Sequence, residues 1–206
     1  NIKKFVFFLL SCNIGEILIV FISILMNLPV PFLAIQLLWL NLVTDSFPAL
    51  ALGMEAGDPD VMERKPRDAN ASILDKQLLI SISVQSIAIA ASSLLAYTTA
   101  LKLYPDNLTL SRTITFTTLI TAELLRAYSS RSQRYSLFKI GFFSNITMVL
   151  GTSFSFLLML LVLYIPFMQE MFETVSLAFV HWEIVLLFAF IPLVIGELYK
   201  LIDRKF

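Results

Sequence analysis

Acidic and amide side chains interrupt apolar segments of this sequence. Glu16 follows Asn13 by three residues, and Asn41, Thr44 and Asp45 stand at i, i+3 and i+4 in a second segment. Both spacings put the side chains of one group on the same face of a helix. Ionisable groups at membrane depth are costly and by default mark an ion or proton pathway, so we predict a functional role for both groups.

A third carboxylate, Glu123, lies among threonines in a later apolar stretch. Together the candidates offer carboxylate, amide and hydroxyl oxygens, a set that suits a hard cation such as Ca²⁺, which takes about 6–8 oxygen ligands. Zn²⁺ or Cu⁺ would need thiolate or imidazole, and the neighbours of Cys12 do not make a soft site. The residue types therefore predict a site for a hard cation.

Pro48 adds a backbone argument beside Asp45. Proline has no N–H, so the carbonyl of Thr44 cannot complete its usual helical hydrogen bond. Broken helices at membrane depth are tolerated where they line a cavity, and their freed carbonyls can coordinate ions. We predict that this helix is unwound near Asp45–Pro48.

Structural roles are the alternatives for several of these residues. Asn13 or Thr44 alone is more typical of a hydrogen bond between helices, and a membrane proline is often only a kink. Arg126 lies one turn from Glu123 and could be its structural partner. Glu16 and Asp45 favour the functional interpretation, because a buried carboxylate needs a reason.

Membrane helices are the elements that must position these groups. The chain is 58% hydrophobic with a mean hydropathy of +0.83, well above a typical soluble domain. Its net charge is zero and no segment is strongly basic, so nucleic-acid binding has no support. Windows of about 20 apolar residues predict six spans. They cover roughly residues 5–26, 32–52, 77–101, 113–129, 141–165 and 182–199, with a charged loop at 53–76.

The positive charges predict the orientation. Of the 15 Lys and Arg residues, only Lys102 and Arg112 fall on the side opposite the N-terminus. Positive residues gather on the cytoplasmic side of membrane proteins. The sequence thus predicts an all-α membrane protein, a bundle of six transmembrane helices with both termini cytoplasmic, formed by a single domain over residues 1–206.

Three motifs carry a resemblance to a known family. They are "SCNIGE" (11–16), "QLLWLNLVTDSFPALALG" (36–53) and "DPDVMERKPR" (58–67). In this order and spacing they resemble the C-terminal membrane half of P-type calcium-transporting ATPases, of the sarco/endoplasmic-reticulum type and its bacterial relatives. The six spans would then be the last six of the family's ten helices.

The resemblance implies how the candidate ligands divide between two calcium sites. One site would comprise Asn13, Glu16, Thr44, Asp45 and Glu123. Asn41 and Asp45 would share the second site with a residue that this chain lacks. The loop 57–68 would contact the phosphorylation domain. Sodium/potassium pumps have an acidic residue in place of Asn41, and manganese/calcium pumps lack a carboxylate matching Glu16, so both positions favour calcium.

The resemblance also implies what the chain would need from outside itself. No "DKTGT" phosphorylation motif occurs in it, so ATP and Mg²⁺ would bind to domains absent from this chain, which alone would not be catalytic. The full-length protein would be a multi-pass pump exporting Ca²⁺ with proton counter-transport. It would lie in a bacterial cell membrane, or in an endoplasmic-reticulum-type membrane if eukaryotic. The alternatives are a Mn²⁺/Ca²⁺ pump, a secondary transporter or channel that does not use ATP, and a purely structural membrane domain.

Overall fold

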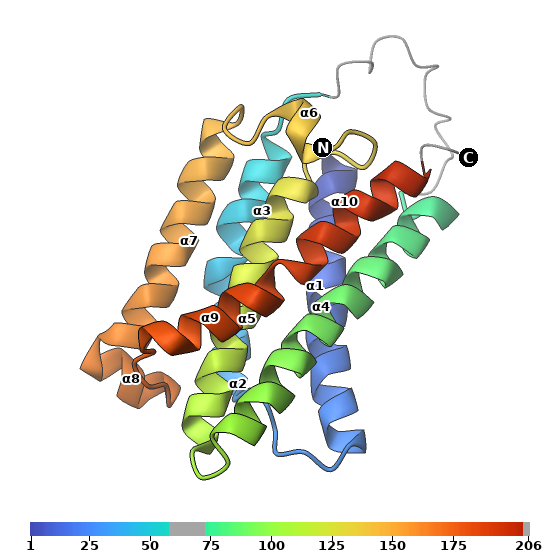
Figure 1. The fold of residues 1–206 in the computed structure, drawn as a ribbon. Coiled ribbons are helices and arrows are strands. Elements are labelled where there is room, and N and C mark those ends of the chain that lie inside the picture. The colour runs from blue at the N-terminus through green and yellow to red at the C-terminus, as the bar shows by residue number, and fades with distance from the viewer. Residues whose placement is uncertain (58–72, 204–206) are drawn as a thin grey trace.

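The regular elements of the described residues are all helices (Figure 1). A computed structural model describes residues 1–57 and 73–203 of the chain. The helices are α1 (Ile2–Leu25), α2 (Ala34–Trp39), the π-helical segment η1 (Leu40–Thr44), α3 (Ser46–Gly53), α4 (Lys76–Leu103), α5 (Leu108–Ser129), α6 (Leu137–Ile140), α7 (Ile146–Tyr164), α8 (Pro166–Phe172), α9 (Phe179–Ala189) and α10 (Ile191–Asp203). The prediction of an all-α membrane protein agrees with this architecture.

Five helical stretches of the described residues are long and apolar enough to cross a membrane. They are Ile2–Leu25, Ala34–Gly53, Lys76–Leu103, Ile146–Tyr164 and Phe179–Ile202. The predicted span 113–129 lies in α5, which is not among them because its threonines lower the hydropathy. Composition therefore supports five of the six predicted spans, and the sixth depends on how α5 is packed.

α5 is the most enclosed helix of the bundle, between α4, α7 and α9 (Figure 1). Its threonine hydroxyls donate to carbonyls one turn earlier, as Thr115 does to Ser111 at 2.7 Å and Thr118 to Ile114 at 2.8 Å. These bonds satisfy the threonine hydroxyls within the helix, whereas Oγ of Ser111 and both carboxylate oxygens of Glu123 have no partner among the described residues. The polarity of this segment is therefore compatible with a position inside the bundle.

A side-chain cap and a division at Phe190 account for the differences between two predicted spans and the helices. Asn145 accepts a hydrogen bond from the backbone N–H of Met148 at 3.0 Å, and this cap starts α7 at Ile146 rather than at residue 141. Gly141 has φ +88°, a conformation that favours glycine and prevents the helix from beginning there. The predicted span 182–199 is likewise divided at Phe190 into α9 and α10, with Pro192 early in the second helix.

The start of α1 and the end of α10 lie at the same end of the bundle (Figure 1). The end of α3 and the start of α4 also lie there, on either side of residues 58–72, which are outside the described part of the chain. This arrangement is compatible with six crossings and with termini on one side. Which side faces the cytoplasm stays a prediction from the positive charges.

Candidate cation site

The helix that carries Asp45 is not unwound near Asp45–Pro48, so this prediction is wrong in its form. Instead, residues 40–44 form a π-helical turn, and the N–H of Asp45 donates to the carbonyl of Leu40 at 3.0 Å. Asp45 itself keeps helical angles, with φ −82° and ψ −27°. Single π-helical turns occur frequently at functional sites. The irregularity thus lies just before the carboxylate rather than after it.

The carbonyl of Thr44 is freed by Pro48, as the sequence indicates, but it has a partner. The hydroxyl of Ser155 on α7 donates to it at 2.7 Å. α7 approaches closely here, because a Cβ on Gly151 would lie only 3.1 Å from the carbonyl oxygen of Phe47. The freed carbonyl therefore joins α7 to the irregular helix and keeps one lone pair for other contacts.

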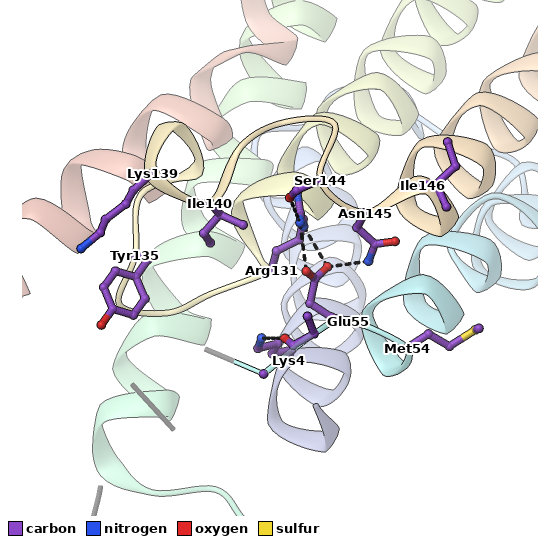
Figure 2. A pocket seen from close by; sticks show the side chains of 12 residues that line it. Lys4, Met54, Glu55, Arg131, Tyr135, Lys139, Ile140, Ser144, Asn145 and Ile146 are labelled. Atoms are coloured by element: carbon purple, nitrogen blue, oxygen red, sulfur yellow. Dashed lines mark hydrogen bonds and ion pairs between the residues drawn. The ribbon is translucent and has the colours of Figure 1, made fainter. Parts of the chain in front are cut away.

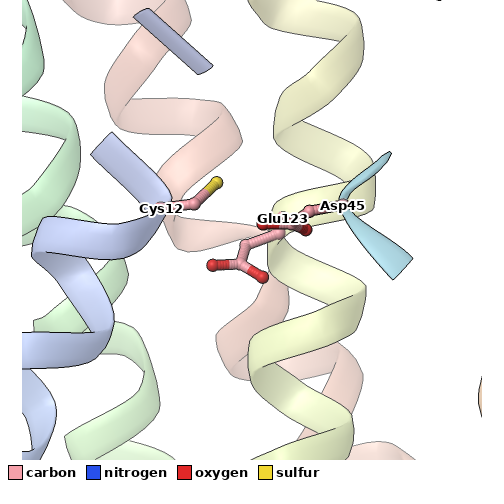
Figure 3. A group of neighbouring side chains, drawn as sticks. All are labelled: Cys12, Asp45 and Glu123. Carbon is pink, nitrogen blue, oxygen red and sulfur yellow. The ribbon is translucent and has the colours of Figure 1, made fainter. Parts of the chain in front are cut away.

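Three side chains from three helices meet in the core of the bundle. Cys12 comes from α1, Asp45 from the junction of η1 and α3, and Glu123 from α5 (Figure 3). All three are buried, and one ligand atom of each lies within 4.8 Å of the other two. Two atoms that bind one Ca²⁺ at about 2.3–2.6 Å each can lie up to about 5 Å apart. One cation could therefore contact all three residues.

The carboxylates of this cluster have oxygens without hydrogen-bond partners among the described residues. These are Oδ2 of Asp45, both oxygens of Glu123 and Oε1 of the neighbouring Glu16. A buried polar atom that makes no hydrogen bond costs about 1–3 kcal/mol, more when charged, and calls for an explanation such as a missing ion. A set of unpartnered oxygens from several helices fits a cation that this cluster would hold.

Glu16 and Asn41, which the resemblance assigns to different calcium sites, are in direct contact. The amide of Asn41 donates to Oε2 of Glu16 at 2.6 Å and to the carbonyl of Leu37 at 3.0 Å. The hydroxyl of Thr44, which is fully buried, donates to the carbonyl of Leu40 at 2.8 Å. The side chains of α1 and of the irregular helix thus face each other, with the carboxylate of Glu16 already held on one oxygen.

Asn13 lies outside this cluster. Its side chain is exposed, and its amide donates to the carbonyl of Leu9 on its own helix at 2.8 Å. The buried face of α1 carries Cys12 and Glu16 instead. Those two residues have i,i+4 spacing, so the same helical periodicity that suggested Asn13 could have identified Cys12.

Arg126, the possible structural partner of Glu123, makes no hydrogen bond to it among the described residues. The guanidinium is fully buried and donates to Oε1 of Gln85 at 3.1 Å and to Sγ of Cys12 at 3.3 Å. It also bonds Ser11, and both oxygens of Glu123 lack a partner among the described residues. A positive charge therefore lies beside the cluster without neutralising its carboxylates directly.

A further buried carboxylate, Glu55, is fully paired at the end of the bundle (Figure 2). Arg131 donates to both of its oxygens, at 2.8 and 2.9 Å, and Asn145 donates to one of them at 2.7 Å. These residues border a pocket of about 470 Å³. Because the carboxylate is occupied by protein donors, this group is a structural ion pair rather than a vacant ligand set.

These features define a class of protein, a helical membrane bundle with unpartnered carboxylates in its core. Residues 29–202 match the model of the family described as "Cation transporting ATPase, C-terminus". The chain belongs to this family.

Relatives in bacteria and mammals support this assignment. The chain is 38% identical over 192 residues to a calcium-transporting ATPase of Bacillus subtilis, covering 93% of this chain and 22% of the relative. It is 35% identical over 220 residues to calcium-transporting ATPase 1 of Bacillus cereus, covering 100% and 25%. It is 37% identical over 207 residues to the human calcium-transporting ATPase type 2C member 1, covering 100% and 22%. The chain thus spans about a quarter of the length of these relatives.

Proposed function

We propose that this chain is the membrane half of an ATP-driven calcium pump that exports Ca²⁺ from the cytoplasm in exchange for protons. The observation that carries the proposal is the set of buried carboxylate oxygens on Glu16, Asp45 and Glu123 that have no partner among the described residues. The names of the relatives, all calcium-transporting ATPases, favour Ca²⁺ as the ion.

The ligands of the pump would come from three helices. Glu16 on α1, Asn41, Thr44 and Asp45 on the irregular helix, and Glu123 on α5 supply side-chain oxygens. Asn13 would contribute only if α1 turned, because its amide now points away from the cluster. A site made from separate helices responds to small movements between them, so a shift of one helix would change the affinity for the cation.

Proton exchange follows from the same carboxylates. When the cation leaves, closely spaced negative charges at membrane depth repel one another and are costly. Binding protons removes these charges, and the protons would then travel inward as Ca²⁺ travels outward. ATP and Mg²⁺ would act on cytoplasmic domains outside this chain, linked to the bundle through the loop 57–68, of which only Gly57 lies within the described residues.

We further propose that α5 is a sixth membrane span and that both termini are cytoplasmic. Burial of α5 among the other helices would let its threonines cross the membrane without contact with lipid. The orientation follows from the positive charges on the side of the N-terminus. For a bacterial source, the membrane would be the cell membrane.

Asp45→Asn in the full-length protein tests the proposal. The substitution keeps the shape of the side chain but removes the charge that a divalent cation needs, so we expect calcium-dependent phosphorylation from ATP to be lost. Asp106→Asn is the matched control, because Asp106 is exposed in the turn between α4 and α5. If Asp45→Asn retained phosphorylation with unchanged calcium dependence, the assignment of the site would be wrong.

A Mn²⁺/Ca²⁺ pump is the alternative within the same class. Glu16 favours the calcium pump, because pumps of the manganese/calcium type lack a carboxylate that matches this residue. Phosphorylation measured in parallel with Ca²⁺ and Mn²⁺ separates the two, and equal activation by both ions would favour the alternative. A secondary transporter is disfavoured by membership of the ATPase family.

A further inference from the structure

A sulfur atom lies in the carboxylate cluster. Cys12 is the only cysteine of the chain, and its side chain is fully buried. Its Sγ lies within 4.8 Å of a carboxylate oxygen of Asp45 and of one of Glu123 (Figure 3). The oxygen-only ligand set predicted for a hard cation therefore has a soft atom beside it.

The two carboxylates independently indicate that this place takes a ligand. Both oxygens of Glu123 are buried without a hydrogen-bond partner among the described residues, and so is Oδ2 of Asp45. Glu123 has no exposed surface, and Asp45 is 1% exposed. The sulfur thus lies beside two carboxylates whose oxygens lack hydrogen-bond partners, and it is not an isolated thiol.

The charges around the sulfur suit a divalent cation bound through a thiolate. Two carboxylates and one thiolate carry three negative charges, and the cation supplies two positive ones. The guanidinium of Arg126, whose Nη1 lies 3.3 Å from Sγ, supplies a third positive charge. Together they offset most of the negative charge, to which the neighbouring Glu16 also contributes, and so lower the cost of net charge in the interior of a membrane protein.

We propose that Cys12, Asp45 and Glu123 form a mixed sulfur and oxygen site for a thiophilic divalent cation, for which Cd²⁺ is the test ion. Thiolate ligands select soft cations, whereas carboxylates accept hard ones. On binding, the S–H bond breaks, the sulfur lone pair forms the bond to the cation, and the proton leaves to water. The site shares Asp45 and Glu123 with the proposed calcium site, so Cd²⁺ and Ca²⁺ compete for it.

The test is a cadmium titration of the full-length protein and its Cys12→Ser variant. A thiolate bound to Cd²⁺ gives a charge-transfer absorption in the ultraviolet, and the difference between the two proteins removes the contribution of other cysteines. We expect the variant to lose this absorption and to bind Cd²⁺ at least about tenfold more weakly, since even second-shell partners are worth about 10–100-fold in metal affinity. Calcium affinity should change less than cadmium affinity, because serine replaces the soft sulfur with a hard oxygen atom.

Asp45→Asn separates this inference from the proposed function. We expect this variant to lose both Cd²⁺ and Ca²⁺ binding, whereas Cys12→Ser weakens the binding of Cd²⁺ more than that of Ca²⁺. A wild-type protein that binds Cd²⁺ through Cys12 but does not bind Ca²⁺ would overturn the calcium pump and leave this inference standing. Equal cadmium affinity and equal absorption in the wild-type protein and Cys12→Ser would overturn the inference, whatever the result for calcium.

Discussion

Two buried glutamates have opposite surroundings in this molecule. Glu55, at the end of the bundle, receives two hydrogen bonds from Arg131 and one from Asn145 (Figure 2). Glu123, in the middle of α5, receives none from the described residues, although Arg126 follows it by one helical turn. The same pair of residue types thus gives a closed ion pair in one region and, in the other, a carboxylate that has no hydrogen-bond partner among the described residues.

The difference separates a structural role from a ligand role. The Glu55–Arg131 pair has its charges matched and also bonds the chain before α7, through the carbonyl of Gly141 and the hydroxyl of Ser144. The guanidinium of Arg126 is instead occupied by neutral partners and by Cys12. Burial is common to both regions, so the lack of a hydrogen-bond partner is what makes Glu123, and not Glu55, the candidate ligand.

The largest expected effect comes from breaking the closed pair with Arg131→Met. The substitution leaves Glu55 buried without its opposite charge, and loss of one partner from a buried pair costs about 3–5 kcal/mol. We expect a free energy of unfolding lower by about that amount, measured by denaturant unfolding of the full-length protein in detergent. Arg134→Met, at an exposed position three residues after Arg131, is the control and should leave stability near that of the wild type. A loss for Arg131→Met no larger than that of the control would mean that the pair is not structural.

The helices themselves follow from apolar run length, but their limits do not. Runs of about 20 apolar residues can hardly form anything else in a membrane, which is why five spans could be predicted. α5 is buried in the bundle despite its low hydropathy, because its threonine hydroxyls form hydrogen bonds within the helix, as Thr117 does to the carbonyl of Thr113. The start of α7 depends on the cap at Asn145, a local contact that hydropathy does not register.

The buried carboxylates of the candidate site could be picked out in the sequence, but the rotation of α1 about its axis could not be predicted. Buried acids attract attention in any membrane sequence, so Glu16, Asp45 and Glu123 could be identified. Whether Asn13 or Cys12 faces them depends on how α1 turns against α4, where Gly15 packs so closely on Ile89 that a Cβ would lie 2.9 Å from that side chain. Such a contact between helices far apart in the sequence is outside the reach of helical periodicity.

A smaller effect is expected from Ser155→Ala, which tests the backbone contact beside Asp45. The hydroxyl of Ser155 satisfies the carbonyl of Thr44, and a typical hydrogen bond contributes about 0.5–1.5 kcal/mol to stability. We expect a free energy of unfolding lower by about 1 kcal/mol in the same denaturant experiment. Ser153→Ala, on the exposed side of the same helix, is the matched control. If both variants were equally stable, the hydrogen bond from Ser155 to the carbonyl of Thr44 would not contribute to stability.

The smallest effect on stability, and the sharpest test of the comparison, is Glu123→Gln set beside Glu55→Gln. The oxygens of Glu123 have no hydrogen bond to lose among the described residues. We therefore expect the free energy of unfolding of the Glu123→Gln protein, measured without calcium, to differ from that of the wild type by less than about 1 kcal/mol. Glu55→Gln leaves Arg131 buried without an opposite charge and should be clearly less stable. Calcium binding should follow the reverse order, weakened at least about tenfold by Glu123→Gln and little changed per folded molecule by Glu55→Gln. A marked loss of stability in Glu123→Gln would show that the carboxylate holds the bundle together, and the two regions would then not differ in role.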